Sequence, residues 1–260
     1  MTASHNGIQL SLPGKVALVT GGSRGIGAST VKMFCAAGAR VFFNYQRARG
    51  AADEVVAVCG AETCAAIQQE LSSATDAERL IAATVEKFGA LDCLVANHGI
   101  WPPEDVPVDR MSEEQWRRTI AVNLDSVFGL IKHSVMQMKR QRRGGSIVIV
   151  SSTAGQRGEA FHCDYAASKG AVISMVRGLS TELARDGIRV NCVAPGWVET
   201  DMSAPALADA KTRERVFSAI PLGRVGTPEE LAAPIVFLCT AHAGFMTGSV
   251  VSVNGGAVLS

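Results

Sequence analysis

Short apolar runs alternate along the chain with longer segments in which apolar positions recur at helical spacing. Seven runs predict buried strands, because they are apolar on both faces: Lys15–Thr20, Arg40–Tyr45, Ala65–Glu70, Cys93–Asn97, Ser146–Ser151, Arg189–Ala194 and Ser249–Val253. The helical spacing predicts helices over Ile26–Ala37, Ala51–Cys59, Asp76–Phe88, Ser112–Arg140, Asp164–Arg185, Ala204–Ser218 and Pro228–Thr240. Strands separated by helices of this length predict right-handed crossovers and a parallel sheet covered on both faces.

The strand at 65–70 is the weakest of the seven and is predicted mainly from its spacing. Two helix starts carry capping signals: Ser112 with Gln115 predicts a capping box, and Thr227-Pro228 is followed by two glutamates. The chain shows no repeat, no low-complexity linker and no break in composition. We therefore expect a flexible N-terminal tail over residues 1–12 and a single domain over residues 13–260.

The charges of the chain nearly cancel. It has 25 lysines and arginines against 24 acidic residues, a formal net charge of +1, so no overall field favours nucleic acid or a membrane surface. The first dozen residues lack the apolar core of a signal peptide, and no apolar run is long enough to span a bilayer. We expect a cytoplasmic protein with no nucleic-acid and no membrane partner.

Seven cysteines are scattered along the sequence, at positions 35, 59, 64, 93, 163, 192 and 239. Their number is odd and none forms a CxxC pair. This usage favours a reducing compartment, in which cysteines serve as small apolar residues, over a disulfide framework or a zinc site. We predict no metal site.

A glycine-rich turn follows the first predicted strand and opens a helix, with the sequence Thr20-Gly21-Gly22-Ser23-Arg24-Gly25-Ile26-Gly27. Glycines let the backbone approach a pyrophosphate, and the helix N-terminus supplies amide donors. The spacing is TGxxxGxG rather than GxGxxG, and an ordinary strand-to-helix turn is a serious alternative for the glycines alone. A Walker A loop is excluded, because no lysine stands at the required position before Ser29-Thr30.

Tyr165 and Lys169 lie four residues apart in a predicted helix and so share a face. A free tyrosine has a pKa near ~10, and a nearby ammonium would move it toward the neutral range. Ser152 ends a predicted strand, where its hydroxyl faces the cleft beyond the carboxyl edge of the sheet. A tyrosine and lysine at this spacing often only decorate a helix; with Ser152 and a dinucleotide turn they predict carbonyl reduction or its reverse.

The chain resembles the short-chain dehydrogenase/reductase family over essentially its whole length. The resemblance is carried by TGGSRGIG at 20–27, Ala96-Asn97-His98-Gly99 where members carry NNAG, Asn123, Ser152, the YxxxK at 165–169, Pro195-Gly196, and a tail from Pro221-Leu222-Gly223-Arg224 through Thr247-Gly248 to Gly255-Gly256. The chain departs from the family at Ala96 and His98, and at Glu70, where an aspartate usually contacts adenine. The resemblance implies a single doubly wound (Rossmann) α/β domain with a seven-stranded parallel sheet, assembled as a homotetramer or dimer.

The resemblance also implies roles for individual residues. It makes Asn123, Ser152, Tyr165 and Lys169 the catalytic set, in which Lys169 also binds the nicotinamide ribose and Asn123 holds the water of a proton relay. It assigns cofactor contacts to Gly21, Ser23, Arg24, Gly25, Ile26, Gly27, Tyr45, Arg47, Glu70, Leu71, Asn97, Gly99, Tyr165, Lys169, Pro195, Gly196, Val198 and Thr200.

The predicted cofactor is NADP(H). Family members that prefer NAD carry an acid at the end of the second strand, where this chain has Tyr45-Gln46-Arg47. Arg24 stands in the glycine turn, where NADP-preferring members often have a basic residue, and a guanidinium pairs well with a 2′-phosphate. The alternative is that Arg24 is only a solvated loop cation.

The predicted function is oxidoreduction of a small ketone or secondary alcohol, closest to 3-oxoacyl-(acyl-carrier-protein) reductase-like members. His98, His162 and Trp197 are candidates for the substrate pocket, with a packed or surface role as the equal alternative. A sugar, polyol or steroid-type dehydrogenase is the alternative enzyme. A non-catalytic NADP-sensing protein is the alternative of another class, and the intact catalytic set argues against it.

Overall fold

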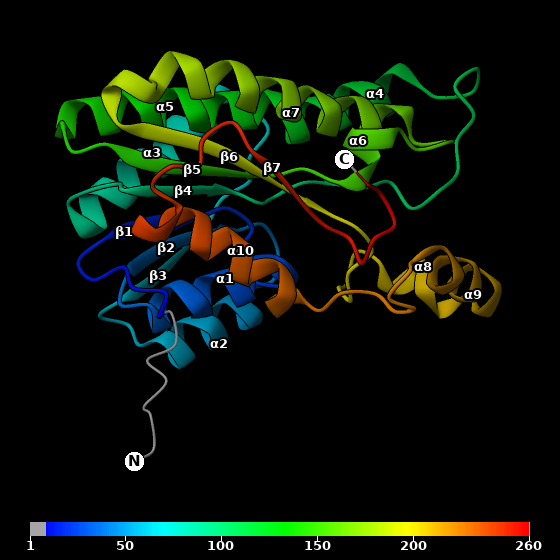
Figure 1. Ribbon diagram of the computed structural model, residues 1–260, viewed down its shortest axis with the longest axis horizontal. Coiled ribbons are helices and arrows are strands. Elements are labelled where there is room, and N and C mark those ends of the chain that lie inside the picture. Colours follow the sequence, from blue (N-terminus) through cyan, green and yellow to red (C-terminus); the bar gives the residue numbers. More distant parts are fainter. Residues whose placement is uncertain (1–8, 260) are drawn as a thin grey trace.

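The computed structural model describes residues 9–259 and has one seven-stranded parallel sheet in the order β3-β2-β1-β4-β5-β6-β7 (Figure 1). The strands are β1 (Val16–Val19), β2 (Arg40–Tyr45), β3 (Cys64–Gln68), β4 (Cys93–Ala96), β5 (Gly145–Val150), β6 (Ile188–Pro195) and β7 (Val250–Val253). All seven predicted strands are confirmed, including the weak one. From β1 the strands are added toward one edge of the sheet, up to β3, and from β4 they are added toward the other edge. Doubly wound folds bind their ligands at this switch point between β1 and β4.

Helices cover both faces of the sheet, as predicted (Figure 1). One face carries α1 (Gly25–Ala36), α2 (Arg49–Cys59) and α10 (Pro228–Cys239), and the other carries α3 (Ala74–Phe88), α4 (Glu113–Ile120), α5 (Ser126–Gln141) and α7 (Cys163–Leu183). Each face has its own apolar core, one around Phe34 and Phe43 and the other around Leu80 and Leu130. The fold is thus a three-layer α/β domain with two cores.

Of the N-terminal tail predicted over residues 1–12, the structure describes only residues 9–12. Residues 1–8 lie outside the described residues. Leu12 is buried in the core on the α1 side, and its N–H donates to the Ala37 carbonyl oxygen at 2.7 Å. Among residues 9–259, no helix combines the length and the apolar character needed to cross a membrane.

Two predicted helices are divided in the structure, and one α-helix of residues 9–259 was not predicted. The segment Ser112–Arg140 contains a π-helical turn, Ala121–Asp125, between α4 and α5. The segment Ala204–Ser218 forms α8 (Ala204–Ala208) and α9 (Ala210–Ala219), because Asp209 is extended and caps α9 by accepting a hydrogen bond from Thr212 N. The unpredicted helix, α6 (Thr153–Arg157), has a single turn and too few residues for a periodic pattern.

The two predicted helix starts have different outcomes. Thr227 and Glu230 form the reciprocal contacts of a capping box at the start of α10, which confirms the signal there. At α4, the Ser112 hydroxyl accepts from Gln115 N at 3.1 Å, but the Gln115 side chain donates to Asp164 at 3.2 Å. The capping-box prediction is therefore wrong in its second half, because Gln115 ties α4 to the buried start of α7 instead.

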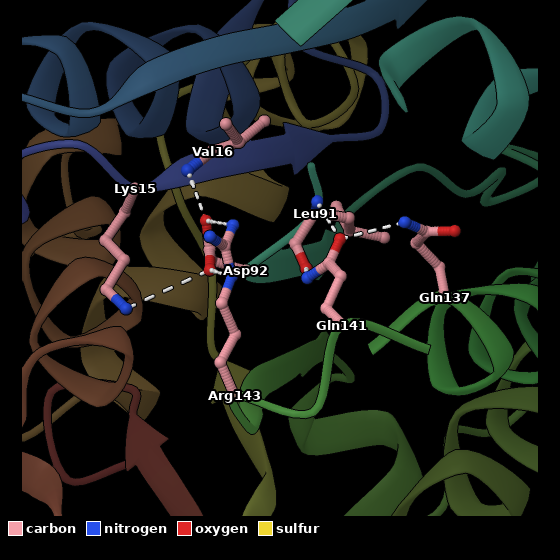
Figure 2. A network of polar contacts seen from close by, with 7 residues as sticks. All are labelled: Lys15, Val16, Leu91, Asp92, Gln137, Gln141 and Arg143. Atoms are coloured by element: carbon pink, nitrogen blue, oxygen red, sulfur yellow. Dashed lines mark hydrogen bonds and ion pairs between the residues drawn. The ribbon is translucent and has the colours of Figure 1, made fainter. Parts of the chain in front are cut away.

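The amino ends of the central strands are held by the Asp92 network, which consists of Asp92, Lys15, Val16 and Arg143 (Figure 2). The Asp92 carboxylate is 4% exposed, accepts from Val16 N at 2.9 Å and pairs with the Arg143 guanidinium at 3.0 Å. Lys15 lies 3.9 Å away. Nearby, the Gln141 side chain bonds both Leu91 N and Leu91 O. A buried carboxylate with this many donors is well satisfied, so β1, β4 and the start of β5 are fixed together.

Candidate active site

A cavity of about 490 Å³ lies at the opposite edge of the sheet, where the carboxyl ends of the strands meet. Its wall is formed by the residues that follow β1, β2, β3, β4, β5 and β6, and by the start of α7. Of the catalytic and cofactor-binding residues predicted from sequence, all line this cavity except Gly27 and Asn123. The structure thus gathers segments that are more than 150 residues apart in sequence around a single space.

Two glycines of the turn, Gly25 and Gly27, occupy positions that do not suit a side chain. Gly25 has a φ of +51°, a region that favours glycine. A Cβ at Gly27 would overlap the Gly21 carbonyl oxygen and lie 2.7 Å from Asn97 Nδ2. Gly27 therefore acts behind the cavity wall, by allowing α1 to approach β1 closely.

The start of α1 suits an anionic ligand. Its N-cap residue, Arg24, is extended and makes no capping hydrogen bond with its side chain. The first-turn amides of α1 therefore have no side-chain acceptor from that residue, and they lie beside the cavity with the favourable end of the helix dipole. The close glycine turn and the open helix start together fit the pyrophosphate of a dinucleotide.

The end of β2 contains a cavity residue, Asn44, that was not predicted from sequence. The Asn44 side chain accepts from Gly21 N at 3.1 Å and donates to Gln69 O at 2.8 Å, so it links the glycine turn to the end of β3. Asn44 lies between two apolar neighbours in a buried strand, where a polar residue is the only sequence signal. The adjacent Tyr45 is buried and lines the cavity beside the exposed Arg47.

Arg24 makes an ion pair across the rim of the cavity. Its guanidinium lies 2.7 Å from Asp201, which lies in the loop after β6, and both side chains are exposed. This partner could not be predicted from sequence, because the two residues are 177 positions apart. An exposed pair of this kind contributes only about 0–1 kcal/mol, so a bound phosphate can compete with Asp201 for Arg24.

Tyr165 and Lys169 lie on one face of α7, as predicted from their spacing. Lys169 is 5% exposed; its Nζ donates to Val150 O at 2.9 Å and lies 5.8 Å from the centroid of the Tyr165 ring. Ser152 follows β5 directly and caps α6, where its hydroxyl accepts from Ala154 N at 3.1 Å. The α6 cap therefore orients Ser152 at the edge of the cavity that Tyr165 also lines.

The electrostatics of the pair differ from the sequence-based expectation. Burial raises the pKa of Tyr165 to about 12; a hydrogen bond with Ser152 lowers it and the charge of Glu159 raises it further. Burial lowers the pKa of Lys169 to about 8. The expectation that Lys169 brings the tyrosine pKa toward neutrality is wrong for the free protein, because burial is the largest influence on the pKa of Tyr165 and raises it. Tyr165 is consequently protonated at neutral pH.

Asn123 lies in the π-helical turn and does not reach the cavity surface. Its Oδ1 accepts from Ile100 N at 2.8 Å, and its Nδ2 donates to Ile100 O at 2.9 Å and to Ser168 Oγ at 3.2 Å. A Cβ at Gly99 would lie 3.2 Å from Asn123 Oδ1 and 3.3 Å from Lys169 Nζ, so these two groups meet across that glycine. Asn123 thus holds the loop after β4 against Lys169; its role in a proton relay stays a prediction.

The three candidate pocket residues have three different environments. Trp197 lines the cavity. His98 also lines it, but its ring nitrogens lie 2.8 Å from Thr20 Oγ1 and 2.7 Å from Ser126 Oγ, and burial lowers its pKa to about 3. His98 is therefore a neutral residue that braces the wall. His162 is buried, outside the cavity wall.

The cavity is also lined by Trp101, Arg157 and Glu159, which were not predicted as site residues. Trp101 follows the NNAG-like segment, and the other two lie between Ser152 and Tyr165. Only their positions in the sequence could have indicated that they line the site, because each lies in a segment next to motif residues. They have no motif of their own.

Three cysteines that are scattered in sequence converge in the fold. The sulfur atoms of Cys35, Cys59 and Cys64 all lie within 4.8 Å of one another, between α1, α2 and β3. Burial raises the pKa of Cys59 to about 12, and hydrogen bonding to Cys64 raises that of Cys35 even further. The thiols of Cys35 and Cys59 are therefore neutral at neutral pH.

Comparison with known proteins agrees with this site. A family model described as "Enoyl-(Acyl carrier protein) reductase" matches residues 21–258. The chain is 38% identical to a 3-oxoacyl-[acyl-carrier-protein] reductase of Synechocystis sp., over 96% of this chain and 99% of that one. It is 36% identical to an L-rhamnose 1-dehydrogenase (NAD(P)(+)) of Azotobacter vinelandii, over 93% and 96% of the two chains.

Among solved structures, the chain is similar to a short-chain dehydrogenase/reductase of Brucella melitensis described as a glucose/ribitol dehydrogenase. The TM-score is 0.88 and the sequence identity 37%, with 97% of this chain and 100% of that chain covered. The fold, the glycine turn and the tyrosine–lysine pair are thus found together with a whole-length match to one family. The chain belongs to the short-chain dehydrogenase/reductase family of oxidoreductases, which act with a nicotinamide cofactor.

Proposed function

We propose that the protein interconverts a ketone and a secondary alcohol with NADP(H) as its cofactor. The observation that carries this proposal is that Ser152, Tyr165 and Lys169 line the same cavity as the open start of α1. The bound nicotinamide supplies a hydride to the carbonyl carbon, or accepts one in the reverse direction. The cavity residues must then manage the charge and the proton on the carbonyl oxygen.

In the reducing direction, Tyr165 acts as the general acid. Its raised pKa keeps the hydroxyl protonated, so it can donate to the carbonyl oxygen. The Ser152 hydroxyl donates a hydrogen bond to the same oxygen and stabilises its developing negative charge. The Lys169 ammonium, whose pKa is about 8, is charged at neutral pH and can return a proton to Tyr165.

The preference for NADP(H) is supported by the charges beside the end of β2 and the start of α1, where the adenosine part of the cofactor would lie. Arg24 and Arg47 line the cavity there, and the end of β2 offers Tyr45 instead of an acid that would repel a phosphate. Arg24 stands at the N-terminus of α1, where its guanidinium adds to the favourable dipole. A 2′-phosphate would therefore meet two cations, while the pyrophosphate would lie at the helix start.

Arg24→Ala should weaken NADPH binding by about 10–100-fold, because a charge-assisted hydrogen bond contributes about 1.5–3 kcal/mol. NADH binding should be unchanged. Asp201→Asn should tighten NADPH binding a few-fold, because it removes the competing partner of Arg24. Fluorescence titration with both cofactors measures these effects.

A matched control for Arg24 is Arg49→Ala, which removes an exposed arginine that pairs with Asp53 on α2. This control should leave both titrations unchanged. An Arg24→Ala protein that binds NADPH as tightly as the wild type, or a wild type that binds NADH more tightly than NADPH, would contradict the cofactor proposal.

The rate of reduction should fall as the pH rises through about 8. The ammonium form of Lys169 is present below its pKa of about 8 and is lost above it, whereas Tyr165 stays protonated until about pH 12. The measurement is kcat/KM for reduction across this range, since that quantity reports ionisations of the free enzyme. A profile that stays level well beyond pH 8 would show that the Lys169 charge is not required.

The resemblance supports a 3-oxoacyl thioester as substrate. The side chains of Trp101, Glu159 and Trp197, which line the cavity, favour a sugar or polyol as a second candidate. Consumption or production of NADPH, followed by absorbance with 3-oxoacyl thioesters, diketones, sugars and polyols, tests the function. A protein that binds NADPH but turns over no member of this panel would favour the sensor alternative.

A further inference from the structure

We propose that Glu159, Trp101 and Trp197 select a compact, uncharged, polyhydroxylated substrate rather than an acyl chain. This inference rests on the proposed oxidoreductase function and names the substrate class of that site. The three residues come from different segments, the loop after β4, the segment between α6 and α7, and the loop after β6. All three line the cavity that contains Tyr165.

The two indole rings form a rigid aromatic corner. Their centroids lie 6.0 Å apart at an interplanar angle of 80°. Trp101 is also stacked on His162, at 4.9 Å and 19°, and His162 Nε2 lies 2.9 Å from Pro102 O. Because the supporting histidine is buried and fixed, the indole faces are preorganised. The negative face of an aromatic ring attracts the weakly positive C–H groups of a sugar or polyol.

Glu159 supplies the polar counterpart of this corner. Its side chain is only 23% exposed, and its carboxylate lies 4.0 Å from His162 Nδ1 and is hydrogen-bonded by Trp101. An ionised carboxylate has about four acceptor sites, so these two neighbours leave capacity for the hydroxyl groups of a substrate. Glu159 and Tyr165 line the same cavity, so the carboxylate shares the space in which the reaction would take place. The charge of Glu159 also raises the pKa of Tyr165.

The other charges of the cavity narrow the substrate class. Arg118 and Arg157 also line the wall, where they can donate hydrogen bonds to hydroxyl oxygens and disfavour a cationic substrate. Glu159 disfavours an anionic one. An acyl chain laid against Glu159 would strip water from the carboxylate and return no hydrogen bond, which is unfavourable. An uncharged molecule with several hydroxyl groups satisfies all of these side chains.

The test compares two probes, a set of pentitols and hexitols oxidised with NADP⁺ and an N-acetylcysteamine thioester of a 3-oxo acid reduced with NADPH. The wild type should turn over at least one polyol with a higher kcat/KM than the thioester. Glu159→Gln should lower kcat/KM for the polyol by about 10–100-fold, because it removes a charged hydrogen-bond acceptor. Glu159→Leu should lower it at least as much and raise kcat/KM for the thioester.

The control is Glu104→Gln, which removes an exposed carboxylate from the loop after β4 without touching the cavity. It should leave the ratio of the two kcat/KM values unchanged. NADPH titration and thermal melting establish that each variant is folded. An unchanged ratio in both Glu159 variants would overturn the inference, and so would a wild type that prefers the thioester. A wild type that turns over neither probe would instead count against the proposed function itself.

Discussion

Tyr165→Phe should lower kcat by about 10²–10⁴-fold, the range that a well-placed general acid contributes. The substitution removes only the hydroxyl. The phenyl ring retains the packing of the tyrosine near Lys169, whose Nζ lies 5.8 Å from the ring centroid. NADPH affinity should therefore change little. Single-turnover consumption of NADPH with an active substrate gives the rate, and fluorescence titration gives the affinity.

The two measurements separate a catalytic role from a structural one. Loss of NADPH binding together with turnover would indicate that Tyr165 mainly shapes the cavity. Turnover within about ten-fold of the wild type would contradict the assignment of Tyr165 as the proton donor, since it would correspond to a loss of less than about 1.4 kcal/mol of transition-state stabilisation.

Gly27→Ala should abolish most NADPH binding, although Gly27 does not line the cavity. Its Cβ would overlap the Gly21 carbonyl oxygen and crowd Asn97, which itself donates to Thr20 O at 3.0 Å. The closest of the crowded atoms belongs to the backbone of the turn, so either the turn or the start of α1 must move. We expect a loss of about 1–3 kcal/mol in the free energy of unfolding, which is typical of overpacking, and a loss of at least about ten-fold in NADPH affinity as the amide donors are displaced.

The matched control is Gly178→Ala in α7, where a Cβ would meet no atom within 4 Å. Because alanine is a better helix former than glycine, this variant should be more stable by up to about 1 kcal/mol and should bind NADPH normally. Chemical denaturation and cofactor titration of the two variants give the comparison. Normal NADPH affinity in Gly27→Ala would show that the turn tolerates a shift of α1.

The sheet could be predicted from sequence because parallel strands buried on both faces are continuous apolar runs. Even the weak strand at 64–68 followed from the regular alternation of strands and helices. The division of the helix over Ser112–Arg140 could not be predicted. Its pattern is helical throughout, and the π-helical turn is accompanied by contacts of Asn123 with Ile100, a residue in a distant loop.

In the candidate site, too, residues in local motifs could be predicted from sequence, whereas residues brought together only by the tertiary fold could not. Tyr165, Lys169 and the glycine turn were found because each is a local motif. Trp101 and Glu159 were missed because their meeting depends on the paths of two loops. The pKa of Tyr165 was expected to move in the opposite direction, since spacing reveals a neighbouring charge but not the extent of burial.

The Asp92 network lies at the opposite edge of the sheet from the cavity, so the residues that hold the strands together are separate from those that line the site. It anchors the amino ends of the central strands (Figure 2), whereas every cavity residue lies at or beyond their carboxyl ends. We therefore expect that the loops around the cavity can be exchanged without disturbing the Asp92 network. A library that recombines the loop after β4 with the segment between α6 and α7 should yield folded proteins with new substrate ranges, so the scaffold is suited to directed evolution.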